Sequence, residues 1–167
     1  MKRGLVAAFL VVVADQVSKF MVFDYLNHTA NVVEFSSWFN LVMAWNTGVS
    51  FSMLHNMGDK GVYVLSLFAL TVVGFLIYWL KKEKIKLMQI ALGFVIGGAI
   101  GNVIDRLRLG AVFDFLDVHV GAHHWPAFNV ADSFICIGAT LIICHGLFGE
   151  GNLSKKNVQS VEKEMKS

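Results

Sequence analysis

Charged residues are scarce in this chain of 167 residues. Only 16% of the residues are Asp, Glu, Lys or Arg, whereas 56% are hydrophobic. A soluble globular domain is closer to about 25% charged and about 45–50% apolar. The composition therefore excludes an ordinary soluble domain.

Cysteine is also rare, and its spacing excludes an internal disulfide. Cys136 and Cys144 are eight positions apart on one predicted helix. Their separation by helical rise is about 12 Å. A disulfide joins Cα atoms that are about 4.4–6.8 Å apart. We interpret both cysteines as packing residues.

Long apolar runs are abundant instead. Residues 62–80 and 87–104 contain no charge at all, and each run is about 27–28 Å long as a helix, close to the roughly 30 Å hydrocarbon core of a bilayer. Two further runs are interrupted by a few polar residues. We predict an all-α membrane bundle of four transmembrane helices, at about 4–23, 62–80, 87–106 and 126–148.

The basic residues predict the orientation of these spans. Lys2 and Arg3, four lysines in 81–86 and four lysines after residue 150 account for ten of the 14 basic residues. The positive-inside rule then places both termini in the cytoplasm. The net charge of +2 reflects this topology and does not indicate nucleic-acid binding.

The first span resembles a secretory signal peptide, because Lys2 and Arg3 precede an apolar run. No A-x-A-like cleavage site follows it, so we expect the span to be retained. Residues 1–150 are predicted to form a single membrane domain without repeats. Residues 151–167 are predicted to be a disordered cytoplasmic tail.

The two outer loops carry strand patterns. We predict a small β element over about 31–55 on the outer surface, with a strand at 38–45, a turn at 46–48 and a return strand at 49–54. An interfacial helix is the alternative for this segment. In the second loop, a period of two places Asp114 among aliphatic neighbours, whereas Asp117 shares its face with His119.

Polar residues inside the spans lie at similar depths in the outer leaflet, which predicts one site. They are Asp15, Lys19, Asn102, Asn129 and Asp132. Buried charges are costly in a membrane and usually face the bundle. We expect Asp15 and Lys19, four residues apart, to form a structural ion pair.

Asp132 has no basic residue within one turn of its own helix. An unpaired buried carboxylate tends to become protonated, and a second carboxylate nearby can share that proton. Asp114 and Asp132, on either side of a short loop, are therefore the candidates for an acid–base pair.

Three other features have structural interpretations. Gly93, Gly97 and Gly101 recur every four residues and predict close approach of a neighbouring helix. Asp105 and Arg106 are interpreted as an interfacial pair. His119, His123 and His124 show no tight ligand pattern, so no metal site is expected.

Several motifs together resemble the bacterial lipoprotein signal peptidase family (signal peptidase II), along nearly the whole chain. The segments are 15–19 (DQVSK), 46–48 (NTG), 97–106 (GGAIGNVIDR), 112–115 (VFDF) and 128–132 (FNVAD). Each is weak alone, but five in this order around four spans are specific.

The resemblance implies an aspartic endopeptidase of the bacterial inner membrane that cleaves diacylglyceryl-modified prolipoproteins just before the lipidated cysteine. It implies Asp114 and Asp132 as the catalytic residues. It also implies substrate-binding or supporting roles for Asn46, Asn102, Arg106 and Asn129, besides Asp15 and Lys19. Inhibition by the cyclic peptide globomycin is expected. No metal or organic cofactor is expected, and we expect a monomer.

Two other functions are consistent with intramembrane acids. A transporter or proton-relay protein would place polar groups along the whole depth of the membrane, whereas the cytoplasmic halves of these spans are nearly bare. A non-catalytic membrane scaffold would use the glycine-rich helix as its interface and would tolerate the loss of both aspartates.

Overall fold

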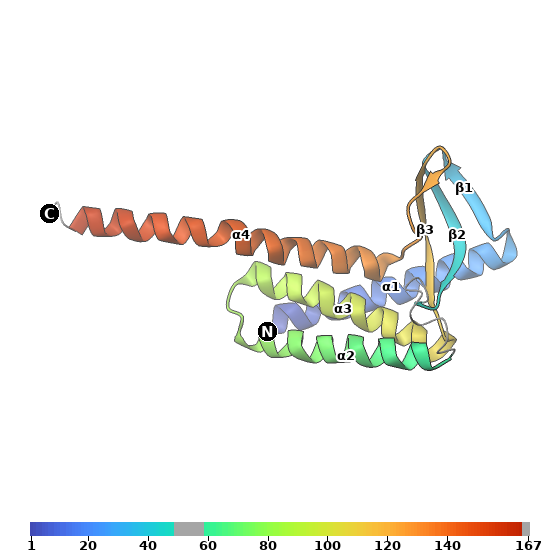
Figure 1. The fold of residues 1–167 in the computed structure, drawn as a ribbon, viewed down its shortest axis with the longest axis horizontal. Helices are drawn as coiled ribbons and strands as arrows, with labels where there is room; N and C mark the ends of the chain where they lie inside the picture. Colours follow the sequence, from blue (N-terminus) through green and yellow to red (C-terminus); the bar gives the residue numbers. More distant parts are fainter. Residues whose placement is uncertain (49–58, 165–167) are drawn as a thin grey trace.

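The computed structural model describes residues 1–48 and 59–164, and its four helices run side by side (Figure 1). The helices are α1 (Lys2–His28), α2 (Asp59–Lys82), α3 (Lys86–Leu109) and α4 (Val130–Glu164). Each contains a stretch that is long and apolar enough to cross a membrane. The predicted fold class, a four-span α-helical bundle with a small sheet, is confirmed.

Two helix ends differ from the sequence prediction. The first helix continues to His28 instead of ending near residue 23. The last helix begins at Val130 and continues to Glu164, through the segment predicted to be disordered. That segment is rich in Lys, Gln and Glu, which favour helix, and contains no proline to interrupt it.

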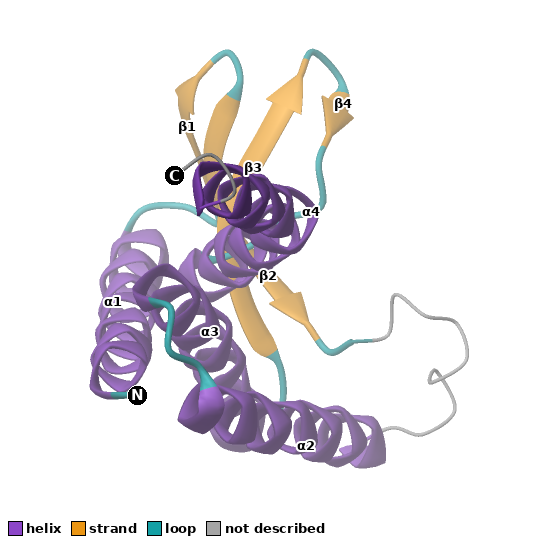
Figure 2. Cartoon of the chain, turned by 90° about the vertical axis from the view of Figure 1, so that its left-hand side faces the viewer, coloured by secondary structure: helices purple, strands orange, loops and turns teal. Residues whose placement is uncertain are grey.

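The third helix, α3, lies among the other three in the end-on view (Figure 2). Its glycines allow close approach, as predicted. A Cβ atom at Gly97 would lie 2.5 Å from the carbonyl oxygen of Ala8 on α1. On the opposite flank, a Cβ atom at Gly98 would collide with the carbonyl oxygen of Ala131 on α4. The backbone of α3 therefore contacts α1 and α4 directly.

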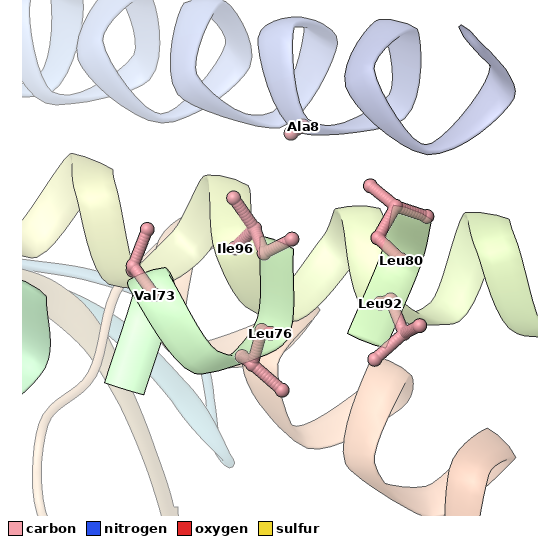
Figure 3. Packing of buried hydrophobic residues seen from close by; sticks show 6 residues of the cluster. All are labelled: Ala8, Val73, Leu76, Leu80, Leu92 and Ile96. Atoms are coloured by element: carbon pink, nitrogen blue, oxygen red, sulfur yellow. The ribbon is translucent and has the colours of Figure 1, made fainter. Parts of the chain in front are cut away.

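A small apolar core joins α1, α2 and α3 (Figure 3). Its buried members are Ala8, Val73, Leu76, Leu80, Leu92 and Ile96. Many other large apolar side chains point outward, such as Phe9 and Leu67, which is the arrangement expected of helices solvated by lipid. Cys136 and Cys144 are among the exposed residues, so their interpretation as packing residues was wrong.

The strands form one antiparallel sheet at the end of the bundle away from the N-terminus (Figure 1). They are β1 (Val32–Ser36), β2 (Phe39–Asn46), β3 (Val112–Val120) and β4 (His123–His124), in that order. The predicted element at 31–55 is correct for its first part. However, β2 pairs with β1 and β3, and the predicted return strand at 49–54 lies outside the described residues.

An aromatic cluster packs this sheet against the C-terminal end of α1. The ring of Phe113 on β3 packs edge-on against Phe23, with centroids 5.8 Å apart, and against Trp45 at 5.2 Å. Leu26, Phe113 and Phe115 are all buried in this contact. These contacts place the sheet over the ends of the helices and fix the position of β3.

Candidate active site

The chain entering α4 is paired with β3. The backbone N–H of Phe128 donates to the carbonyl of Leu116 at 3.0 Å, and the N–H of Leu116 donates back at 2.8 Å. This bridge lies beside Asp114. It brings the first turn of α4, with Asn129 and Asp132, next to the strand that carries the other candidate acid.

Asn129 and Asp132 form a reciprocal cap at the start of α4. The N–H of Asp132 donates to Oδ1 of Asn129 at 2.9 Å, and the N–H of Asn129 donates to Oδ2 of Asp132 at 3.3 Å. This is the geometry of a capping box, in which two otherwise unpaired helix N–H groups are satisfied. The helix begins at Val130 because Asn129 is its cap, and the cap fixes the carboxylate of Asp132.

Two asparagines connect the predicted acids. The side-chain amide of Asn129 donates to Oδ1 of Asp114 at 2.7 Å and to Oδ1 of Asn102 at 3.1 Å. The amide of Asn102 in turn donates to Oδ1 of Asp132 at 2.7 Å. Asp114 and Asp132 are therefore parts of one hydrogen-bonded network, as the sequence predicted.

Asp114 lies in a nearly dry environment, with 2% of its surface exposed. Burial raises its pKa to about 6, and the charge of Asp132 acts in the same direction. Hydrogen bonds from Asn46 and Asn129 oppose the shift because they favour the ionised carboxylate. Asp114 therefore retains a proton at a pH at which an ordinary aspartate is ionised.

Asn46, at the end of β2, reaches Asp114 from the other side. Its amide donates to Oδ2 of Asp114 at 3.0 Å, and its Oδ1 accepts from the N–H of Gly48 at 2.9 Å. Gly48 has a φ of +80°, a conformation that favours glycine. The register between β2 and β3 shifts between Leu41 and Ala44. Such irregularities bend a strand and redirect its side chains near a site.

Asp132 differs from Asp114 in its surroundings. It is half-buried rather than buried. It also lies in the first turn of α4, where the helix dipole and free N–H groups stabilise negative charge. The two acids thus have different environments, which is the arrangement that separates an acid from a base.

Lys19 contacts Asn102 of this network and lies at the centre of a buried cluster of charged side chains. Its Nζ atom is 2.9 Å from Asp15, 2.8 Å from Asp105 and 3.2 Å from Oδ1 of Asn102. The predicted pairing of Asp15 with Lys19 is confirmed. The cluster extends further than a local pair, since Oδ1 of Asp15 also accepts from the N–H of Ala131 at 2.9 Å. It therefore ties α1 to both α3 and α4.

The sequence interpretation of Asp105 was wrong. Its partner is Lys19 on α1, and Arg106 takes part in none of the ion pairs found in the described part of the chain. Asp105 also accepts from the N–H of Phe113 at 3.2 Å and from the amide of Gln16 at 3.0 Å. It therefore anchors the start of β3, directly before Asp114.

Gln16 is a site residue that the sequence interpretation missed, and Asp105 is one to which it gave a different partner. Both lie inside the family motifs at 15–19 and 97–106. Their inclusion in those motifs was the signal that could have identified them. Arg106 lies close to the network, where Nη1 is 3.5 Å from the carbonyl of Asn102, and its charge interacts with Asp132 and Asp114.

Asp117 belongs to a separate cluster. It accepts from the amide of Asn40 at 2.9 Å and pairs with Nδ1 of His124 at 2.9 Å. Burial alone would raise its pKa, but the bonds from His124 and Asn40 outweigh burial and the pKa lies below its usual value. The alternation of β3 therefore separates the two acids as predicted, and Asp117 has polar partners of its own.

Comparison with known proteins identifies relatives that match most of the chain. The chain is 44% identical over 158 residues to the lipoprotein signal peptidase of Aeromonas hydrophila, with 93% of each chain covered. It is 44% identical over 144 residues to the lipoprotein signal peptidase of Teredinibacter turnerae, with 85% of each covered. A solved structure of a bacterial membrane enzyme superposes with a TM-score of 0.75 at 29% identity, covering 91% of this chain and 92% of that one.

The sequence profile of one protein family also matches most of the chain. The profile is described as signal peptidase (SPase) II and matches residues 7–148. Those residues include α2, α3, most of α1, the first part of α4, the sheet and every residue of the polar network described above. The chain belongs to the signal peptidase II family.

Proposed function

We propose that this protein removes the signal peptide from prolipoproteins, using Asp114 and Asp132 as its catalytic pair. Its family and the names of its relatives support this activity. The assignment of the two residues rests on the chain of hydrogen bonds from Asp114 through Asn129 and Asn102 to Asp132. Such a network orients two carboxyl groups that share a proton.

Asp132 acts as the general base in this mechanism. It is the more exposed acid, it lies in the first turn of α4, and its carboxylate accepts hydrogen bonds from Asn102 and Asn129. It removes a proton from a water molecule as the water oxygen attacks the scissile carbonyl carbon. The C–O bond forms while the carbonyl π electrons move to its oxygen.

Asp114 acts as the general acid. Burial favours its protonated form, so it donates a hydrogen bond to the carbonyl oxygen and stabilises the tetrahedral intermediate. When that intermediate collapses, the C–N bond breaks and the leaving amine takes a proton from the pair. In the resting enzyme the proton of the pair resides on Asp114, whose protonated form burial favours.

The substrate is a prolipoprotein that is cleaved just before a diacylglyceryl-modified cysteine. Its acyl chains lie in lipid while the peptide lies between the helices and the sheet. Asn46, Asn102, Arg106 and Asn129 bind the substrate or hold the acids, and globomycin competes for the same position. The protein acts as a monomer without a metal or organic cofactor.

The enzyme lies in the bacterial inner membrane with both termini in the cytoplasm and the active site near the outer leaflet. The basic residues of the N-terminus and of the 81–86 loop support this orientation. The N-terminus and the far end of α4 both lie at the end of the bundle opposite the sheet (Figure 1). Transporter and scaffold functions have no support from the relatives.

The decisive experiment is cleavage of a lipidated prolipoprotein by the purified protein in detergent. Asp114→Asn and Asp132→Asn should each lower turnover by about 10²–10⁴-fold, since each removes one proton-transfer group. Asp117→Asn is the matched control on the same strand and should retain turnover close to that of the unchanged protein. Near-normal turnover of either active-site variant would disprove the catalytic assignment, and activity without an ion gradient would exclude transport as the primary role.

A further inference from the structure

An apolar groove lies on the lipid-facing side of α1, between its N-terminus and the point where α1 meets α4. It encloses about 940 Å³. One wall is formed by α1 from Val6 to Val17, the floor by Ile90 and Phe94 of α3, and the far wall by Phe134 of α4. The rings of Phe94 and Phe134 pack edge to face with centroids 4.9 Å apart, which joins the floor to that wall.

The two ends of the groove are different. At one end lie Lys2 and Arg3, both exposed. At the other end α1 and α4 meet, because Asp15 accepts the hydrogen bond from the N–H of Ala131 at 2.9 Å. The length from Lys2 to Val17 is about 22 Å by helical rise, less than the roughly 30 Å of the bilayer core. The groove is therefore open toward the N-terminal side of the membrane and ends before the outer surface.

The lining has the chemistry of a phospholipid site. Between its basic end and its closed end, the described lining residues are all apolar, and none is acidic. A hydrocarbon chain fits such a surface, and an anionic headgroup would meet Lys2 and Arg3. The signal peptide of a substrate fits less well, because its own basic N-terminal region would be repelled by these two cations.

We propose that this groove binds an anionic phospholipid of the cytoplasmic leaflet, with one acyl chain along α1 and its phosphate against Lys2 and Arg3. The bound chain fills the space between α1 and α4 that protein side chains leave open. The lipid therefore supports α1, the helix that carries Asp15 and Lys19 into the buried ion cluster. This role is separate from peptide cleavage.

Native mass spectrometry of the purified protein tests this proposal. The probe is an equimolar mixture of phosphatidylglycerol and phosphatidylcholine with the same acyl chains. We expect the first bound lipid to be phosphatidylglycerol by a preference on the order of tenfold, since each basic residue near an anionic headgroup favours it. The double variant Lys2→Gln, Arg3→Gln should lose the preference, whereas Lys81→Gln, Lys84→Gln should keep it.

That control removes two exposed charges on the same side of the bundle that do not line the groove. An equal loss of the phosphatidylglycerol preference in both double variants would show a general attraction of anionic lipid to this end of the bundle and would overturn the proposal. Equal binding of the two lipids by the unchanged protein would overturn it too. A dimer mass in place of bound lipid would identify a second copy of the chain as the occupant.

A second pair of variants tests the acyl chain. Leu10→Trp places a bulky side chain within the groove, whereas Leu5→Trp makes the same change at an exposed position outside it. The first should lower lipid occupancy several-fold and the second should not. Equal occupancy in both variants would place the lipid elsewhere.

Discussion

The side-chain amide of Asn129 lies 2.7 Å from a carboxylate oxygen of Asp114, although the two residues are 15 positions apart. Asn129 is completely buried, so this bond has no competition from water. Because the same residue caps α4, the position of Asp114 depends on where that helix begins. The carboxylates of Asp114 and Asp132 are therefore both positioned by one residue, the first by the side chain of Asn129 and the second by its backbone N–H.

Replacing Asn129 with Ala should lower turnover by about 10- to 100-fold, because it leaves a buried carboxyl oxygen of Asp114 without its donor, which costs about 1–3 kcal/mol. The measurement is single-turnover cleavage of a lipidated prolipoprotein. Ser133→Ala is a suitable control, because the Ser133 hydroxyl donates to the carbonyl of Asn129 at 3.0 Å and bonds to neither carboxylate in the described part of the chain. The orienting role fails if the two variants behave alike.

The pH dependence of kcat/KM should show an alkaline limb near pH 6. Asp114 must be protonated to act as the acid, and its pKa is about 6 in the free enzyme. Activity should therefore fall as pH rises through this value. Since kcat/KM reports the ionisations of the free enzyme, a pH–rate profile measures it directly.

Asn46→Ala should move that alkaline limb to higher pH. The amide of Asn46 donates to Asp114 and favours its ionised form, so removing the donor favours the protonated form. The maximal activity of the variant should fall, and its alkaline limb should lie at a higher pH. A limb that stays in place or moves to lower pH would contradict the assignment of Asp114 as the acid.

Asp105→Asn should destabilise the protein, since Lys19 would lose one of its two carboxylates and β3 would lose its charged anchor. Breaking a buried ion pair costs about 3 kcal/mol. Thermal unfolding in detergent measures the loss. Asp24→Asn provides the control, because Asp24 forms only an exposed pair with His28 at 3.6 Å; a similar loss there would show that the burial of Asp105 is irrelevant.

Gly97→Ala should weaken the packing of α1 against α3. The added Cβ atom would lie 2.5 Å from the carbonyl oxygen of Ala8, and overpacking of this kind costs about 1–3 kcal/mol. Gly74→Ala on α2 is the matched control, since nothing lies within 4 Å of its new Cβ atom. The Gly97 variant should melt at a lower temperature, and the Gly74 variant should melt no lower than the unchanged protein.

The four spans and the convergence of the polar residues were predictable because each depends on local properties. Hydropathy over 18–20 residues identifies a membrane helix wherever its neighbours lie. The alternation along β3 distinguished Asp114 from Asp117 because successive side chains of a strand point to opposite faces. The close helix contact at Gly97 followed from the glycine spacing in the same way.

The partners of these residues depended on contacts between distant segments. β2 pairs with β3, about 70 positions away, and Asp105 pairs with Lys19 across two helices. A strand pattern in one loop does not specify which other strand supplies its hydrogen bonds, so the hairpin at 38–54 was the simpler prediction. Asp105 and Arg106 are adjacent in sequence, but successive side chains of a helix point in different directions, and Asp105 meets Lys19 on α1 instead.

By itself the sequence determined the membrane helices and the two acids, because burial of apolar surface and the cost of charge in lipid are properties of each segment. Only the tertiary structure decided how the acids differ. Asp114 is buried on β3, whereas Asp132 is half-buried at the capped start of α4. Asn129 and Asn102 hydrogen-bond to these two acids and so bring β3, α3 and α4 together. In the mechanism that we propose, this difference in solvation makes Asp114 the acid and Asp132 the base.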